Sequence, residues 1–249
     1  MTINFITTYQ KYILAFVFAM IFVWENILPQ RYFSELSRHN TKNFLIGGIN
    51  VILTFFLGIF FSQYLNWFNK NYHGLIQYMS IPLTYKIVVA LVAADILMYW
   101  WHRLNHITFL WRFHSFHHED LQMNSTTGMR FHVGELILSY VFRMIWYPLF
   151  GINSMLVLLF STIHFSMIIF HHSNIRISAT ADKVLRWVIT SPGMHRIHHS
   201  NKWKETNSNY TSILSCWDWI FRSYVHKPEG EINFGVPYTE SGVQPRDAK

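Results

Sequence analysis

Cysteine and charge are both scarce in this sequence of 249 residues. Cys216 is the only cysteine, which excludes an intrachain disulfide and every CxxC zinc or redox motif. Charged residues make up 13% of the chain, whereas a soluble domain usually carries about 25%. Apolar residues make up 51% and aromatic residues 18%. This composition is typical of a membrane protein.

The positive net charge has a different explanation from nucleic-acid binding. The chain carries 20 Lys and Arg against 13 Asp and Glu, a net charge of +7. Its basic residues are scattered between apolar runs and form no continuous stripe of the kind that follows a phosphate backbone. No nucleic-acid partner is therefore expected, and a positive-inside bias of membrane loops accounts better for the charge. The N-terminus lacks the features of a cleaved signal peptide, so its first apolar segment is expected to be retained.

Five apolar stretches are long enough to cross a bilayer as helices, which takes about 20 residues. Gly151 to Asn153 separate the last two stretches, which predicts a helical hairpin over 134–172. The shorter apolar segment 75–83 is expected to be interfacial or part of a loop. The expected fold class is all-α, an integral membrane bundle of four or five spanning helices. The five stretches cover approximately residues 12–28, 43–65, 85–104, 134–152 and 153–172.

The basic residues of the loops predict an orientation. The loop after the first span carries three basic residues and the third span ends in two more, whereas the loop after the second span has Lys70 as its main one. Alternation of spans then places 30–42, 102–133 and everything after 172 on the same side. The positive-inside rule predicts that this side is cytoplasmic.

Most of the 15 histidines lie in tight sets on this predicted cytoplasmic side. Residues three and four apart share one face of a helix, so each set is expected to aim its rings in one direction. Four such faces would enclose a common site. The sets are HxxxH at His102 and His106, HxxHH at His114, His117 and His118, the pair His171 and His172, and a second HxxHH at His195, His198 and His199.

Crowded imidazoles point to metal binding. They disfavour one another's protonation, and Arg103 and Arg196 beside them add to this effect, so a folded site is expected to hold the rings neutral. Neutral imidazole binds iron, zinc, copper and nickel. A structural zinc takes about four ligands and a catalytic zinc about three, so the larger number here predicts two metal ions. The candidate ligands are His102, His106, His114, His117, His118, His172, His195, His198 and His199.

Other polar residues leave alternatives open. Asp95 shares a helical stripe with His102 and His106 and lies about 10 Å deeper than His102. It is expected either to orient a ligand histidine or to pair with Arg143 inside the membrane.

The isolated histidines have less specific roles. His132 is a candidate ligand or a partner of a ligand, and His171 is a candidate supporting residue. His164 is expected to be a core or substrate-channel residue. Three further histidines are expected to be ordinary surface or core residues, namely His39, His73 and His226.

Between about Asp95 and Phe221 the sequence resembles the fatty acid hydroxylase superfamily, the membrane-bound histidine-rich di-iron enzymes that include the sterol desaturase family. The resemblance rests on DILMYWWHRLNH, FHSFHH, NSTTGMRFHVGE, FHHSN, SPGMHRIHHS and NYTSILSCWDWIF. It implies a helical membrane bundle with a cytosolic metal-binding cap, ligation by the nine histidines above, and support from Asn209, Tyr210, Trp217 and Asp218. Where the family commonly has Asn-Tyr-Gly and Phe-Gly-Thr, this chain has Thr211 and then Arg222-Ser223. That departure affects the substrate assignment and leaves the ligands intact.

The function implied is oxidation of a lipid C–H bond. Two non-haem irons, with O2 as co-substrate, would hydroxylate or desaturate a sterol, fatty acyl, sphingolipid or ether-lipid substrate. No catalytic residue beyond the metal centre is expected. The chain has no flavin, haem or iron–sulfur motif, so electrons are expected from an external reductase, ferredoxin or cytochrome.

Two alternatives to an oxygenase follow from the same histidines. A membrane metal-binding or transport protein would place ligands along a path across the bilayer. A b-type haem electron carrier would use a pair such as His118 and His132. The expected organisation is one structural domain with membrane helices in 1–92, a catalytic region in 93–224 and a polar tail in 225–249.

Overall fold

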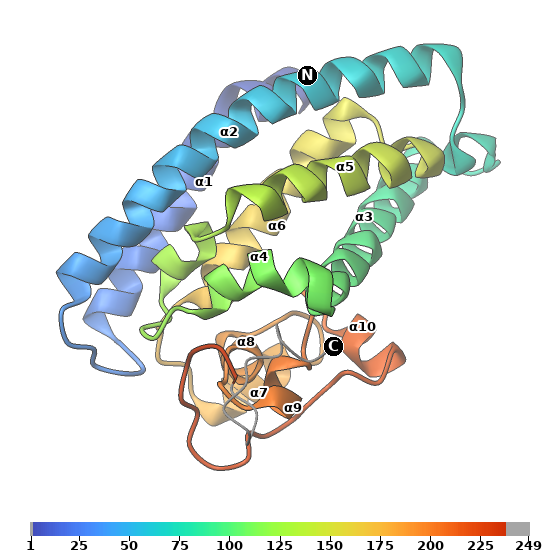
Figure 1. Cartoon of the computed structure of the whole chain (residues 1–249). Coiled ribbons are helices and arrows are strands. Elements are labelled where there is room, and N and C mark those ends of the chain that lie inside the picture. The colour runs from blue at the N-terminus through green and yellow to red at the C-terminus, as the bar shows by residue number, and fades with distance from the viewer. Residues whose placement is uncertain (1, 238–249) are drawn as a thin grey trace.

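The five apolar stretches form five long helices in the computed structural model, which describes residues 2–237 (Figure 1). Each is long and apolar enough to cross a membrane. The prediction of an all-α bundle of four or five spanning helices is therefore confirmed. The helices are α1 (Thr2–Ile27), α2 (Leu36–Asn71), α3 (Leu83–Asn105), α5 (Val133–Phe150) and α6 (Ser154–His172).

Shorter helices connect the bundle and build a cap at one end of it. The cap comprises residues 173–237, and it lies where α3 and α6 end (Figure 1). Within residues 2–237, β-structure is limited to isolated bridges such as Ile189 with Leu214. The short elements are η1 (Leu75–Tyr78), α4 (Thr108–His118), η2 (Ser125–Met129), α7 (Ala179–Leu185), α8 (Pro192–His198), α9 (Trp203–Thr206) and α10 (Cys216–Ile220).

The α5–α6 hairpin shows why the sequence turns where it does. Gly151 has φ 84°, a left-handed conformation that glycine adopts without a steric penalty. Beside it, the backbone N–H of Ile152 donates to the carbonyl of Tyr147 at 2.8 Å. The Asn153 side chain then accepts from the backbone N–H of Leu156 at 3.0 Å and caps α6. The predicted hairpin is confirmed.

The core of the bundle lies between α2, α3, α5 and α6. Alanines at Ala90, Ala93 and Ala94 are buried on α3 and let the neighbouring helices approach closely. Large residues fill the remaining space, including Phe61, Leu65, Tyr147, Ile152 and Phe160. The outward faces carry exposed apolar side chains such as Phe55 and Phe56, as expected for helices surrounded by lipid.

The segments that carry the histidines lie at one end of the bundle. The loop after α1, the region between α3 and α5, and the cap all lie there (Figure 1). Gln30 donates its backbone N–H to the carbonyl of Asn174 at 2.7 Å, which joins the first loop to the cap. The prediction that these three segments lie on the same side therefore matches the structure.

The predicted C-terminal tail is described only in part. Residues 225–237 run back over the rest of the cap, and Phe234 and Val236 are buried there. The backbone N–H of Asn201 donates to the carbonyl of Asn233 at 2.7 Å. Residues 238–249 lie outside the described residues.

Candidate metal centre

The nine histidines predicted as ligands lie in two adjacent groups. Within each group, one ring nitrogen of every member lies within 4.8 Å of those of the others, and all rings but that of His102 are buried. The groups touch, since the rings of His118 and His199 stack with centroids 4.4 Å apart. The five-histidine group comprises His102, His106, His114, His118 and His198, and the four-histidine group comprises His117, His172, His195 and His199.

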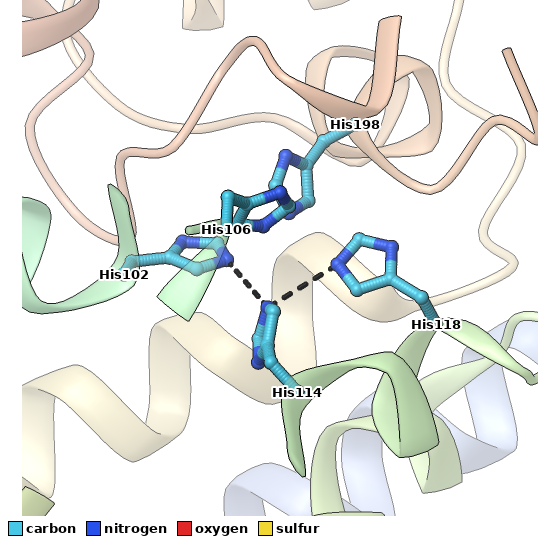
Figure 2. A group of neighbouring side chains, drawn as sticks. All are labelled: His102, His106, His114, His118 and His198. Carbon is cyan, nitrogen blue, oxygen red and sulfur yellow. Dashed lines mark hydrogen bonds between the residues drawn. The ribbon is translucent and has the colours of Figure 1, made fainter. Parts of the chain in front are cut away.

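The rings of the five-histidine group come from helices α3, α4 and α8. His102 lies on α3 and His106 caps its C-terminus, His114 and His118 lie on α4, and His198 lies on α8. Figure 2 shows these rings facing one another. The Nε2 atom of His114 lies 3.1 Å from Nε2 of His102 and 3.2 Å from Nε2 of His118.

The four-histidine group links α4, α6 and α8. His172 ends α6, and its Nε2 lies 2.9 Å from Nε2 of His117 and 3.0 Å from Nε2 of His195. His199 caps α8 and completes the group. Both groups lie at one end of the bundle, which does not fit ligands spaced along a transport path.

Each HxxHH motif is divided between the two groups, so for these two motifs the expectation that a set points in one direction is wrong, whereas His102 and His106 do join the same group. His114 and His118 join the five-histidine group while His117 joins the other, and in the second motif His195 and His199 are separated from His198. Adjacent residues point about 100° apart around a helix, so the last two histidines of the motif face different sides. The two motifs thus supply both groups.

Hydrogen bonds at the outer nitrogens define which ring nitrogen carries the proton in the five-histidine group. The Nδ1–H of His102 donates to the carbonyl of Tyr210 at 2.6 Å, and that of His114 donates to Oε1 of Glu135 at 2.9 Å. The carbonyl oxygen and the carboxylate oxygen both act as acceptors, so in neutral rings both Nε2 atoms carry lone pairs. Two lone pairs 3.1 Å apart repel each other unless a cation lies between them.

The four-histidine group repeats this arrangement. The Nδ1–H of His117 donates to the carbonyl of Arg130 at 3.0 Å, and that of His172 donates to the carbonyl of Ile168 at 2.7 Å. Their Nε2 lone pairs face each other at 2.9 Å. Both nitrogens of the buried His199 ring also have no hydrogen-bond partner. The donor set fits a metal ion in each group.

A proton is a poor substitute for that cation. Burial, followed by the neighbouring rings, lowers the pKa of His117 and His118 well below the usual value for histidine. Burial and the adjacent histidines also lower the pKa of His195 and His199. The pKa of His198 is lowered to about 3 by burial, although its hydrogen bond to the Ser208 carbonyl opposes the change. These five rings are therefore held neutral, as the sequence predicted.

The terminal motif organises the backbone behind His102. Asp218 accepts hydrogen bonds from the backbone N–H groups of Tyr210 at 2.9 Å and Thr211 at 3.1 Å, and from the Ser223 hydroxyl at 2.6 Å. Tyr210 in turn offers its carbonyl to His102. Asp218 and Tyr210 therefore lie in a continuous chain of contacts to the five-histidine group.

Asn209 supports the backbone next to His195 in the four-histidine group. Its φ is 52°, in the left-handed region that asparagine tolerates better than most residues. Its side-chain amide donates to the carbonyl of Met194 at 3.2 Å, directly before His195. The side-chain oxygen accepts from the backbone N–H of Val225 at 2.9 Å.

Asp95 makes neither of the contacts expected for it. Its Oδ2 accepts from the backbone N–H of Leu214 at 3.2 Å and from Nε1 of Trp217 at 2.8 Å. Arg143 instead donates to the Ser139 hydroxyl at 2.8 Å. The segment around Leu214 inserts beside α3 and supplies the donors that the carboxylate needs, so both proposed contacts are wrong.

Three other histidines lie outside both groups. His132 accepts from the backbone N–H of Gly134 at 3.0 Å and caps α5, which leaves the haem pairing with His118 unsupported. His171 packs its ring 4.0 Å from that of His195 and bonds the carbonyl of Ser212 at 3.2 Å. His164 stacks on Phe160 inside α6.

Glu135 has a supporting role that was not predicted from the sequence. This carboxylate lies behind His114, and it also accepts from the side-chain amide of Asn105 at 3.3 Å. Such carboxylates fix the orientation of a ligand histidine and increase its basicity. A signal was present, because Glu135 is the only acidic residue in the apolar stretch 133–150.

Two further buried carboxylates join the bundle to the metal-binding end. Asp120 lies 2.7 Å from Nε2 of His39, a half-buried residue of α2. Burial raises the pKa of Asp120, but its contacts with His39 and its other hydrogen bonds prevail and lower it to about 2. Glu25 on α1 accepts from the backbone N–H groups of Ser125 at 3.0 Å and Asn174 at 2.9 Å.

Comparison with known proteins agrees with this geometry. A sequence model of the fatty acid hydroxylase family matches residues 87–223, more than half of the chain. The chain is 26% identical over 200 residues to alkylglycerol monooxygenase of Xenopus tropicalis, covering 76% of this chain and 41% of that protein. It is 27% identical over 159 residues to the ornithine lipid hydroxylase OlsE of Rhizobium tropici, covering 64% and 47%. The chain thus spans less than half the length of these curated relatives. No solved structure matches it.

Proposed function

The chain belongs to the fatty acid hydroxylase family, and from this premise we propose that it hydroxylates a lipid C–H bond with two histidine-bound iron ions. The observation that carries the proposal is the pair of buried groups in which Nε2 lone pairs face each other. One ion would lie in the five-histidine group and the other in the four-histidine group. Iron held there supplies the activation of O2, which imidazole alone does not provide.

The protein's own residues prepare the two groups before a metal arrives. Backbone carbonyls of Tyr210, Arg130 and Ile168 fix the ring tautomers, so each Nε2 presents a lone pair inward. Glu135 adds a negative charge behind His114. Burial keeps water from competing for the nitrogens and preserves the neutral form that binds metal.

The position of the site suits a substrate that is dissolved in the bilayer. His102 and His172 lie at the ends of two spanning helices, α3 and α6. A lipid could keep its head group at the interface while its chain reaches the site. By their names, the two relatives act on alkylglycerols and on ornithine lipids. We therefore propose an amphiphilic lipid as substrate and hydroxylation rather than desaturation.

The reaction needs electrons from outside the chain. One oxygen atom of O2 enters the C–H bond and the other is reduced to water, which consumes a pair of electrons and a pair of protons. A reductase, ferredoxin or cytochrome would supply the electrons. We propose that it does so on the cytoplasmic side, as the basic loop residues predict for the metal-binding end. We also propose that region 93–224, which contains all nine candidate ligands, is the catalytic part.

Lipid analysis of producing cells tests the proposal. Cells with the wild-type chain should accumulate a lipid that has gained one oxygen atom, whereas cells with His195→Ala should not. His73→Ala, on an exposed residue outside both groups, is the matched control and should behave as wild type. Identical lipids in all three strains, with the chain present in the membrane, would contradict the proposal.

A further inference from the structure

The cap carries a cluster of large apolar side chains on its surface, here called the aromatic edge: Val184, Trp187, Val188, Trp219 and Ile220. These residues are between 45% and 67% exposed. The Trp187 and Trp219 rings stack with centroids 5.5 Å apart and an angle of 10°. Contiguous exposed apolar surface marks an interaction site. We propose that the aromatic edge is embedded in the same bilayer that the five helices span.

The start of α10 and the chain directly before it lie alongside a membrane-spanning helix. Both Leu214 and Trp217 donate to Oδ2 of Asp95, which lies ten residues before the end of α3 at Asn105. At the rise of an α-helix this is about 15 Å before that end. Ile213 packs against the core cluster of the bundle. The segment that leads into α10 is therefore inserted beside the spanning part of α3.

The aromatic edge is continuous with the outer surface of α3. Phe221, which follows α10, stacks on Tyr99 with ring centroids 5.2 Å apart and packs its edge on Trp100 at 4.9 Å. Trp100 is itself exposed. The backbone N–H of Ser215 donates to the carbonyl of Val188 at 3.2 Å and joins the other half of the edge to this segment. Figure 1 shows α10 beside the end of α3.

The charges around the edge fit a lipid head-group boundary. Lys183 and Arg222 are exposed beside it, whereas Arg186 is paired with Asp182 at 2.6 Å. Tryptophan together with basic residues is typical of the membrane–water interface, where the phosphates attract the cations. A soluble acidic protein could satisfy the same cations. The contacts of Leu214 and Trp217 with Asp95 favour the bilayer, because they hold the segment next to the edge against the spanning helix α3.

Spin labelling measures this depth directly. In a Cys216→Ser background, single cysteines would replace Val184, Val188 or Ile220, and Lys204→Cys on the exposed part of α9 is the matched control. The labelled full chains are reconstituted in bilayers of phosphatidylcholine and phosphatidylglycerol. Labels on the edge should collide several-fold more with O2 than with a water-soluble nickel chelate, and the label at position 204 should show the opposite preference. Edge labels as accessible to nickel as the control would overturn the proposal and indicate a docking surface for a soluble protein.

A second measurement avoids the change at Cys216. Tryptophan fluorescence of the wild-type chain in bilayers with brominated acyl chains is compared with that of a Trp187→Phe/Trp219→Phe double variant. If the edge is embedded, the quenched fraction of the fluorescence should fall in the double variant. A double variant whose quenched fraction rises, because the two removed tryptophans were the unquenched ones, would contradict membrane insertion.

Discussion

The two histidine groups share helices α4 and α8, but they are supported differently. In the five-histidine group, a carboxylate lies behind one ring, since His114 donates to Glu135. In the four-histidine group, His117 and His172 donate to backbone carbonyls. The first group thus has one more ring and a fixed negative charge, whereas the second has no ring to spare for a four-coordinate ion. Two ions bound there would experience unequal electrostatic environments.

Removing a ring should affect the four-histidine group most. His195→Ala leaves three rings in that group and does not alter the membership of the other. The iron content should fall from two ions per chain to one, and lipid hydroxylation should fall below detection. Metal analysis of the purified protein, together with lipid analysis, measures both effects.

The matching change in the five-histidine group sharpens the comparison. His118→Ala leaves four rings there, so the iron content of the purified protein should remain closer to that of wild type than in His195→Ala. Equal iron loss in the two variants would show that the extra ring is not a spare ligand.

Changing Glu135 should weaken only the five-histidine group. Removing an outer-shell partner of a ligand typically costs about 10–100-fold in metal affinity, so Glu135→Ala should release one of the two ions faster to a chelator. Glu135→Gln keeps a hydrogen-bond acceptor for His114 and loses the charge, so its effect should be intermediate. Glu231→Gln, on an exposed residue of the cap, is the control. Faster release of both ions would contradict the assignment of Glu135 to one group.

Glu25 should matter more for the four-histidine group, because Asn174 lies two residues after His172. Glu25→Ala leaves the N–H groups of Ser125 and Asn174 without their acceptor, at a cost of about 1–3 kcal/mol for an unsatisfied buried group. A lower melting temperature in detergent and faster metal release from this group are expected. The exposed Glu35 provides the control variant, Glu35→Ala, which should melt as wild type does.

The smallest effect should come from the opposite end of the bundle. Gly151 has a left-handed backbone conformation. The Cβ atom that Gly151→Ala adds there would clash with the side chain of Gln77. The stability should fall by about 1 kcal/mol or somewhat more, with the metal content unchanged. Thermal unfolding and metal analysis of one preparation check both parts. A loss of iron in this variant would mean that metal content follows general stability and not the individual groups.

Much of the fold could be predicted because membrane helices depend on local composition. The five spans and the turn at Gly151 follow from apolar length and from glycine, and both are present in the structure. The nine histidines that form the two groups could also be predicted, from their close spacing in the sequence. Their distribution over two groups could not, because it depends on how α4 and α8 are rotated against each other.

The supporting contacts were harder to predict for the same reason. Asp95 finds its donors on Leu214 and Trp217, more than a hundred residues away, where the cap inserts beside α3. Likewise, His39 is paired with Asp120, a contact between α2 and the loop after α4. Spacing along one helix carries no information about such partners from other segments.

The iron content of the purified wild-type chain tests the central claim most directly. Metal analysis combined with X-ray absorption at the iron edge should find two irons per chain with imidazole nitrogen ligands and no haem absorption band. A single ion per chain, or iron bound as haem, would contradict an account in which the two histidine groups each hold one ion.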